Sequence, residues 1–321
     1  MSEIDILSFG ETMTMLVAEQ TGDLAAVRHY EKRIAGADSN VAIGLSRLGF
    51  NVAWLSRVGN DSMGRFVTDS LQHEGVDCSH VAVDAGHPTG FQFKSLELEG
   101  ADPVVEYFRR GSAASHLSVN DITPDLLKAR HLHATGIPAA LSDSCRELSG
   151  ALMTQMRDAG RSVSFDPNLR PSLWSSQATM IREINQLAGL AHWVMPGLAE
   201  GELLTGFDTP ADIARFYLDM GVEAVVIKLG AEGAYYRTQM NQAFVPGVAV
   251  AKVIDTVGAG DGFAVGVISA LLENLDFAQA TARGNWIGSL AVQSRGDMEG
   301  LPTRAALQAA GLAQESRRQL A

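Results

Sequence analysis

The segment Asp255-Thr256-Val257-Gly258-Ala259-Gly260-Asp261-Gly262-Phe263 leads directly into an apolar stretch at 264–272. Its small residues predict a turn whose backbone N–H groups point outward at the start of a helix, a place suited to a phosphate or a developing anion. Asp261 would lie in the same positive field, where a carboxylate repels an anion but can accept the proton of a hydroxyl. The segment predicts an anion hole beside a general base. The alternative is a glycine turn in which Asp261 only caps the helix.

Two other phosphate-binding patterns do not fit this chain. The dinucleotide fingerprint needs a third glycine where Phe263 stands, and it belongs near the first strand rather than late in the sequence. Gly59 and Gly64 have the glycine spacing of a Walker loop, but Arg65-Phe66 follows in place of Lys-Ser/Thr. These departures argue against a dehydrogenase and against a Walker-type nucleotide site.

Strands and helices alternate along most of the chain. Residues 4–9 read as a buried strand, and Asp38 or Ser39 is expected to cap a helix that ends at Gly49. The alternation continues with strands predicted at 52–58, 131–134, 162–166, near Trp193 and at 224–228, and with helices at 62–73, 143–159, 212–219 and after Gly260 and Phe277. It predicts an α/β fold with a mostly parallel sheet and helices on both faces.

Two segments interrupt this alternation. Residues 88–112 read as two strands around a turn at 100–103, and residues 11–34 lack a helical period. Together they predict a small separate sheet, either a lid over a cleft or a set of extra edge strands. No repeat, low-complexity tract or linker divides the chain, so we expect a single domain over 1–321 with the lid as a discontinuous part.

The composition excludes several classes of protein. The chain has 321 residues, of which 46% are hydrophobic and 19% charged, as in globular rather than disordered or fibrous proteins. Its 25 Lys and Arg against 37 Asp and Glu give a net charge of −12, which disfavours a nucleic-acid partner. The longest uncharged apolar stretch, 262–272, is shorter than the roughly 18 residues of a membrane span. The acidic start and only two cysteines, Cys78 and Cys145, predict a cytoplasmic protein.

A second glycine segment, Ala35-Gly36-Ala37-Asp38-Ser39-Asn40-Val41-Ala42, leads into the first helix. Together with residues 255–261 it resembles the paired signatures of the ribokinase-like (phosphofructokinase B-type) carbohydrate kinases, with Ala35 where the family has its first glycine. The likeness covers nearly the whole chain, including residues 56–64. It implies a three-layer α/β/α fold, ATP and Mg²⁺ as cofactors, and a monovalent cation such as K⁺ near Asp255, as in many relatives.

The resemblance also implies roles for residues on the sugar side of the site. Matched by position, Asp261 is the catalytic base and Gly36 and Asn40 contact the sugar. The anion hole, which also touches the nucleotide, is formed by Gly258, Ala259 and Gly260.

On the nucleotide side the match is looser. Lys228 and Gly230 fall near the nucleotide phosphates, and Asn285 falls beside the adenine. Glu200 either holds a water of the Mg²⁺ shell or serves as an acid at a helix N-terminus, because Gly197 replaces the Asn of the family segment.

Within the family, residues 105–113 and 165–174 look like the branch that phosphorylates acidic keto sugars, closest to 2-keto-3-deoxygluconate kinases with 2-ketogluconate kinases beside them. The tail at 295–302 fits the same branch. A net acidic protein must supply local cations for a carboxylate substrate, and Arg109 and Arg170 can do so through planar bidentate pairing.

Two further positions bear on the substrate. Tyr107 matches a lid contact, as Arg109 does. Gln92 stands where related 2-keto-3-deoxygluconate kinases carry a tyrosine. An amide there favours a substrate with an additional hydroxyl, such as 2-ketogluconate.

Other functions remain open from the sequence alone. A kinase for a neutral sugar or nucleoside, such as fructose, ribose or adenosine, would leave Arg109 and Arg170 as surface charges. A non-catalytic sugar or nucleotide sensor with the same fold would have no use for Asp261 beside a phosphate. An exposed lid sheet is the surface through which a homo-oligomer would form.

Overall fold

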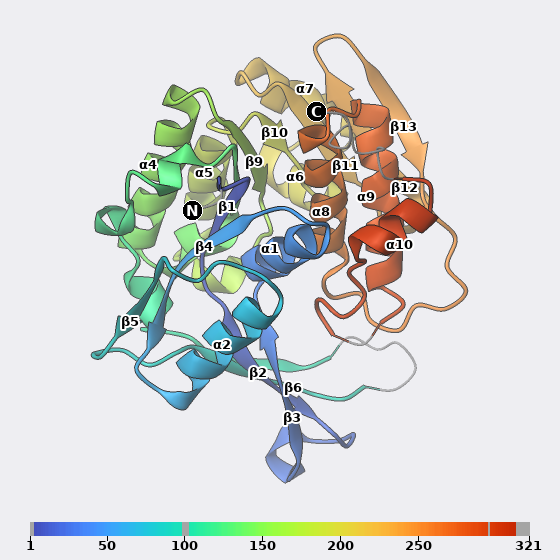
Figure 1. Cartoon of the computed structure of the whole chain (residues 1–321). Helices are drawn as coiled ribbons and strands as arrows, with labels where there is room; N and C mark the ends of the chain where they lie inside the picture. The colour runs from blue at the N-terminus through green and yellow to red at the C-terminus, as the bar shows by residue number, and fades with distance from the viewer. Residues whose placement is uncertain (1–2, 98–102, 295, 313–321) are drawn as a thin grey trace, which may run out of the picture.

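The protein is described by a computed structural model that covers residues 3–97, 103–294 and 296–312. Its strands form one nine-stranded and one four-stranded sheet (Figure 1). The large sheet has the order β13 (Gln242–Pro246), β12 (Gly233–Thr238), β11 (Ala224–Lys228), β10 (Trp193–Val194), β9 (Ser162–Asp166), β8 (His131–Thr135), β1 (Ile6–Phe9), β4 (Val52–Gly59) and β5 (Val81–Asp84). From β11 to β5 every neighbouring pair is parallel, while β12 and β13 run antiparallel at one edge.

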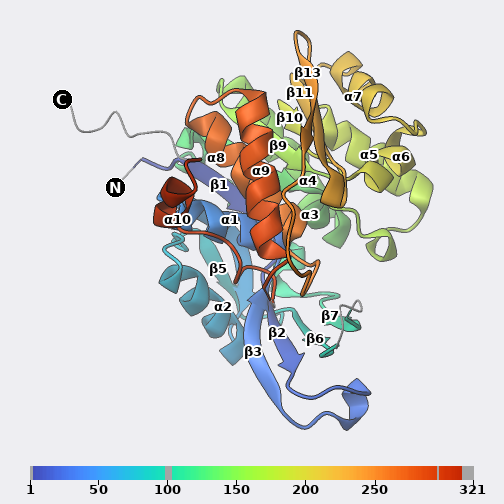
Figure 2. The same ribbon diagram turned by 90° about the vertical axis from the view of Figure 1, so that its right-hand side faces the viewer.

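Helices cover both faces of the large sheet (Figure 2). One face carries α3 (Gly136–Leu141), α4 (Asp143–Asp158), α5 (Gln177–Ala188), α6 (Leu198–Thr205) and α7 (Pro210–Asp219). The other carries α1 (Ala37–Arg47), α2 (Ser62–His73), α8 (Ala259–Leu272), α9 (Phe277–Ala291) and α10 (Arg304–Ala309).

The core consists of two apolar clusters, one on each face of this sheet. Successive side chains of a strand point to opposite faces, so strands such as β1, β4 and β11 contribute to both clusters. In β11, for example, Val225 and Ile227 belong to one cluster and Val226 to the other. This two-sided burial confirms the predicted three-layer α/β/α fold.

The four-stranded sheet lies apart from the large one, below it in Figure 1. Its order is β3 (Tyr30–Ala35), β2 (Met13–Ala18), β6 (Phe91–Lys94) and β7 (Val105–Phe108). The predicted small sheet from residues 11–34 and 88–112 is therefore present. The predicted turn at 100–103 lies outside the described residues except for Pro103.

Several predicted elements have the expected bounds, but the first helix begins differently. The strands at 162–166 and 224–228 and the helix at 62–73 are confirmed. The prediction that Asp38 or Ser39 caps α1 is wrong, because α1 begins at Ala37 after Gly36 and has no side-chain cap. Ser39 instead donates its hydroxyl to the Gly36 carbonyl at 2.9 Å from within the first turn. None of the described helices has the length and apolar character needed to cross a membrane.

Candidate active site

A cavity of about 390 Å³ opens where the parallel strands end, between the start of α8 and the small sheet. Glu11 follows β1, Asp166 ends β9 and Lys228 ends β11, so the carboxyl ends of three strands meet there. Open α/β sheets place their ligands at this edge. The lining brings together eleven residues predicted from the sequence: Gly36, Asn40, Gln92, Tyr107, Arg109, Arg170, Glu200, Lys228, Gly258, Gly260 and Asp261.

The turn before α8 is built around Gly258. This residue has φ +80°, and a Cβ on it would lie 2.2 Å from the carbonyl oxygen of Asp297, so only glycine fits. Gly258 offers no side chain to cap the helix. The N–H groups in the first turn of α8 therefore face the cavity with the positive end of the helix dipole, as an anion site requires.

Asp261 lies in this first turn and is buried, with 8% of its surface exposed. Its carboxylate accepts hydrogen bonds from the Asn40 amide at 2.8 Å and from the Asn168 amide at 3.4 Å. The pKa of Asp261 is raised to about 7, chiefly by burial; the Asn40 hydrogen bond and Lys228 oppose this rise, and the charges of Asp166 and Asp297 add to it. A carboxyl group that titrates near neutrality can both hold and release a proton at physiological pH.

Lys228 brings positive charge to the anion site. Its ammonium lies 2.6 Å from an Asp166 oxygen, and a Cβ on Gly260 would lie 3.5 Å from its Nζ. Burial lowers the pKa of Lys228, but Asp166 and Glu200 outweigh it, and the net shift is upward. The side chain therefore stays charged beside the first turn of α8.

Glu200 lines the same cavity, but its carboxylate caps the N-terminus of α6. Its two carboxylate oxygens accept the N–H groups of Leu169 at 2.7 Å and Gly197 at 2.8 Å. The acid at a helix N-terminus, one of its two predicted roles, is thus present in the structure. The bond to Leu169 also fixes the loop that carries Asn168 and Arg170.

The two arginines predicted to bind a substrate carboxylate differ in whether a carboxylate of the protein already pairs with them. Arg109 is buried and pairs with Glu11, with Nε and Nη2 at 2.7 and 2.6 Å from the same oxygen, so its charge is already neutralised inside the protein. Arg170 is half-buried and donates to its own loop carbonyls at Asn168 and Leu169. Within the described ranges no carboxylate pairs with Arg170, which leaves it as the cation available to a ligand.

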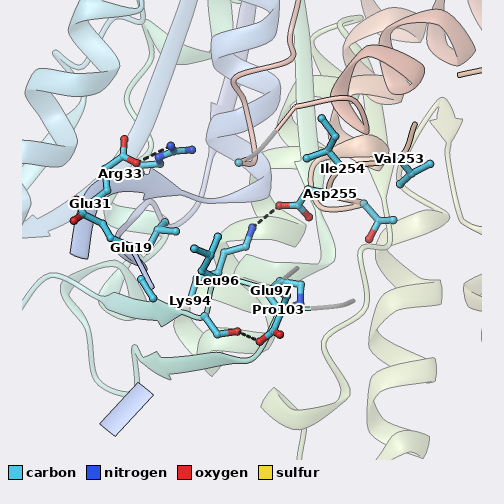
Figure 3. A pocket seen from close by; sticks show the side chains of 15 residues that line it. Glu19, Glu31, Arg33, Lys94, Leu96, Glu97, Pro103, Val253, Ile254 and Asp255 are labelled. Carbon is cyan, nitrogen blue, oxygen red and sulfur yellow. Dashed lines mark hydrogen bonds and ion pairs between the residues drawn. The ribbon is translucent and has the colours of Figure 1, made fainter. Parts of the chain in front are cut away.

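Four predicted residues lie outside the cavity lining. Ala259 follows Gly258 in the first turn of α8. Gly230 begins a short 3₁₀ turn after β11. Asn285 donates to the carbonyls of Val245 and Pro246, both at 3.0 Å, and so ties α9 to β13. Asp255 lines a neighbouring cavity of about 270 Å³, where Lys94 binds it (Figure 3).

The cavity also contains residues that the sequence did not single out. Glu11, Lys94, Asp166, Asn168 and Asp297 all line it. Asp166 and Asn168 follow a predicted buried strand, and this position at a strand end could have identified them. Glu11, Lys94 and Asp297 carry no local signal, because their partners are distant in the sequence.

Phosphoryl transfer to an alcohol needs an anion site for the phosphate and a base for the hydroxyl proton, side by side. The first turn of α8 and Asp261 provide both within one turn of helix. The site is therefore that of a phosphotransferase with an alcohol as acceptor.

Comparison with known proteins agrees with this class. The chain matches the model of the pfkB family carbohydrate kinase over residues 3–304. It belongs to the pfkB family of carbohydrate kinases, which confirms the resemblance and the kinase activity inferred from the sequence.

Three similar proteins illustrate the likeness. The chain is 53% identical over 304 residues to the 2-dehydro-3-deoxygluconokinase of Bacillus subtilis (strain 168), covering 94% of each protein. A crystal structure of a PfkB protein from Polaromonas sp. JS666 is 53% identical, with a TM-score of 0.89 over 95% of this chain and 99% of that one. A putative ribokinase II of E. coli, solved in complex with ATP and Mg²⁺, is 26% identical, with a TM-score of 0.87 over 95% and 98%.

Proposed function

We propose that the protein transfers the γ-phosphoryl group of ATP to the primary hydroxyl of 2-keto-3-deoxygluconate, giving the 6-phosphate. This sugar acid is the same compound as the 2-dehydro-3-deoxygluconate named for the Bacillus subtilis relative, which is 53% identical over 94% of the chain. The observation that carries the proposal within the site is that the Arg170 side chain and Asp261 line the same cavity.

The charges around the cavity favour an acidic substrate. Three of its cations are already paired with carboxylates: Arg109 with Glu11, Lys228 with Asp166, and Lys94 with Asp255 and Asp297. Arg170 lacks such a partner among the described residues. A substrate carboxylate would supply it through a charge-assisted hydrogen bond of the kind guanidinium groups make best. A neutral sugar would leave this charge uncompensated.

The reaction follows from the position of Asp261. Ionised Asp261 takes the proton of the primary hydroxyl, the hydroxyl oxygen attacks the γ-phosphorus, and ADP leaves. Asn40 and Asn168 hold the carboxylate in place. The N–H groups at the start of α8 and the Lys228 ammonium stabilise the negative charge on the phosphoryl group in flight.

ATP and Mg²⁺, both named in the E. coli ribokinase II structure, complete the site. No cluster of three or more His, Cys, Asp or Glu able to hold a metal occurs in the described ranges. Magnesium usually keeps several waters and binds through phosphate oxygens, so a dedicated protein cage is not required. Asp166 and Glu200 would reach such an ion through its water shell, because each of their carboxylate oxygens already accepts a hydrogen bond. The ion would neutralise phosphate charge during transfer.

The small sheet acts as the lid of this site, within a single domain. Its inner face brings Gln92, Tyr107 and Arg109 into the cavity lining. Closing it over the substrate would exclude water, so that the phosphoryl group passes to sugar rather than to solvent.

2-Ketogluconate is the second candidate substrate, and Gln92 favours it. This side chain is buried, lines the cavity and lies opposite Tyr107 in the β6–β7 register. Its amide can donate to and accept from a hydroxyl, which is the group that 2-ketogluconate has and the 3-deoxy acid lacks.

The outer face of the lid also suggests a homo-oligomer. Phe91 stacks on Phe108 at 4.8 Å, and Phe93 packs edge-on against both rings. Phe108 is 49% exposed, so a second copy of the chain would bury this aromatic patch.

We assign the protein to the cytoplasm, since its two cysteines are both free and buried.

The product of the reaction tests this function. With Mg-ATP and 2-keto-3-deoxygluconate, phosphorus NMR should show one phosphomonoester, coupled to the C6 protons, for each ADP formed. ADP formation without a sugar phosphate, or phosphate on another hydroxyl, would refute the proposed transfer.

A further inference from the structure

Lys94 forms the contact between the small sheet and the loop that leads into α8. The side chain comes from β6, points to the inner face with Gln92, and is buried despite its charge. Its ammonium lies 2.9 Å from an Asp255 oxygen and 3.3 Å from an Asp297 oxygen. Figure 3 shows Lys94 reaching across the gap toward Asp255. We call these three residues the Lys94 bridge.

Both carboxylates of the Lys94 bridge are tied to the anion site. The other Asp255 oxygen accepts the N–H of Val257 at 3.0 Å, which shapes the turn before α8. The Asp297 backbone packs against Gly258 so closely that no side chain could stand there. Moving the Asp255 carboxylate or the Asp297 backbone would therefore move the turn whose N–H groups face the phosphate.

The two carboxylates need a cation between them. Their side chains are only 12% and 9% exposed. Burial raises the pKa of Asp297, Lys94 lowers it, and Asp255 raises it again. Two buried carboxylates that share one ammonium would repel each other or take up a proton if that positive charge were absent. In this chain Lys94 supplies that charge.

The same geometry bears on the monovalent cation expected near Asp255. Each oxygen of that carboxylate is already engaged, one by Lys94 and one by the Val257 N–H. A metal ion bound directly to the same carboxylate would stand next to the ammonium, which carries a like charge. The residues present do not fit K⁺ at this carboxylate.

We propose that the Lys94 ammonium is the built-in cation of the Asp255–Asp297 pair, so that phosphoryl transfer in this chain requires no added monovalent ion. Lys94 is a positioning residue: it holds the turn before α8 in the shape that receives the phosphate. The inference rests on phosphoryl transfer at α8 and not on the choice of sugar.

The wild-type protein gives the first test. ADP release is measured in choline chloride and again at equal ionic strength in KCl or NH₄Cl, with whichever sugar turns over best. We expect kcat to change less than twofold and the melting temperature to be the same in the three salts. Stimulation of fivefold or more by K⁺ over choline would overturn the proposal.

Variants give the second test. Lys94→Ala removes the charge and opens space, and should lower kcat at least tenfold with a smaller effect on the KM for sugar. NH₄⁺ or K⁺, but not choline, should then raise the kcat of this variant at least fivefold and raise its melting temperature. Lys128→Ala, which removes an exposed lysine paired with Asp125, is the matched control and should respond to no salt.

The variant outcomes are decisive in both directions. A folded Lys94→Ala protein with full activity, or one whose loss no small cation restores, would overturn the role of Lys94 as the cation. If Lys94→Ala does not fold, the salt dependence of the wild-type protein alone decides. If neither sugar acid is a substrate but another sugar is, the proposed function fails and the salt test still applies.

Discussion

The amide of Asn40 donates a 2.8 Å hydrogen bond to the carboxylate of Asp261 across 221 residues of sequence. It joins the first turns of α1 and α8, which carry the two glycine-rich segments of the chain. The side chain predicted to touch sugar therefore also holds the predicted base. The bond stabilises the ionised form of Asp261, because it lowers a pKa that burial has raised.

Asp261→Asn should abolish turnover while leaving ATP in place. The amide keeps the shape of the carboxyl group but cannot accept the hydroxyl proton, so we expect kcat to fall by about 10²-fold or more. Calorimetric titration with Mg-ATP should give a Kd within a few-fold of wild type. Near-normal turnover would remove Asp261 from its proposed role.

The pH dependence should follow the ionisation of Asp261. Because its pKa is raised to about 7 and the ionised form is the base, kcat/KM should rise with pH through about 7 and then level off. Asn40→Ala removes a hydrogen bond that lowers this pKa, so the rise should shift to higher pH. An unchanged midpoint in Asn40→Ala would contradict the coupling between the two residues.

Arg170 and Arg109 should respond differently to alanine. Arg170→Ala should raise the KM for a sugar acid by more than tenfold, about 1.4 kcal/mol, because it removes a charge-assisted contact made to the substrate. Arg182→Ala, at an exposed arginine of α5, serves as the control and should leave KM unchanged. Equal KM values in wild type and Arg170→Ala would assign the carboxylate contact elsewhere.

Arg109→Ala should act mainly on stability. It leaves the Glu11 carboxylate buried without its cation, and breaking such a pair costs about 3–5 kcal/mol. Chemical denaturation should show this loss, and Arg109→Ala with Glu11→Gln should recover part of it. A fully stable Arg109→Ala protein would show that the pair is not needed for folding.

Asp38 should make the fold less stable as the pH rises. Its pKa is raised to about 7, chiefly by burial and partly by the charge of Asp261, whereas the unfolded value is near 3.8. The folded state thus holds a proton that the unfolded chain releases, and stability falls between about pH 4 and 7. Asp38→Asn should raise the melting temperature at pH 8 more than at pH 5.

The control for Asp38→Asn is Asp208→Asn, at an exposed loop position. It should change the melting temperature little at either pH. If the Asp38→Asn protein is no more stable than wild type at pH 8, the buried charge is compensated in another way.

Features encoded locally could be predicted from the sequence. The glycines before α8 predict a turn that only small residues can make, and the alternating apolar residues of 162–166 and the apolar run of 224–228 indicate buried strands. The alternation of strands and helices then restricts the topology to a parallel sheet, whose carboxyl edge carries the site.

Features that depend on residues distant in the sequence could not be predicted from the sequence. Arg109 reads as a free cation in the sequence, and only the fold brings Glu11, 98 residues earlier, against it. Lys94 and Asp255 are 161 residues apart, and nothing near either one signals their contact. Aspartate often caps helices, and for this reason Asp38 is expected to do so. In the structure α1 starts one residue before Asp38, and the carboxyl group of Asp38 is buried.

The substrate specificity of the kinase is tested most directly by kcat/KM for ADP release with Mg-ATP and five acceptors: 2-keto-3-deoxygluconate, 2-ketogluconate, fructose, ribose and adenosine. We predict that 2-keto-3-deoxygluconate gives the highest value, that 2-ketogluconate follows, and that Arg170→Ala removes most of the advantage of both acids. A higher value for fructose, ribose or adenosine than for either acid would contradict the assignment to an acidic keto sugar.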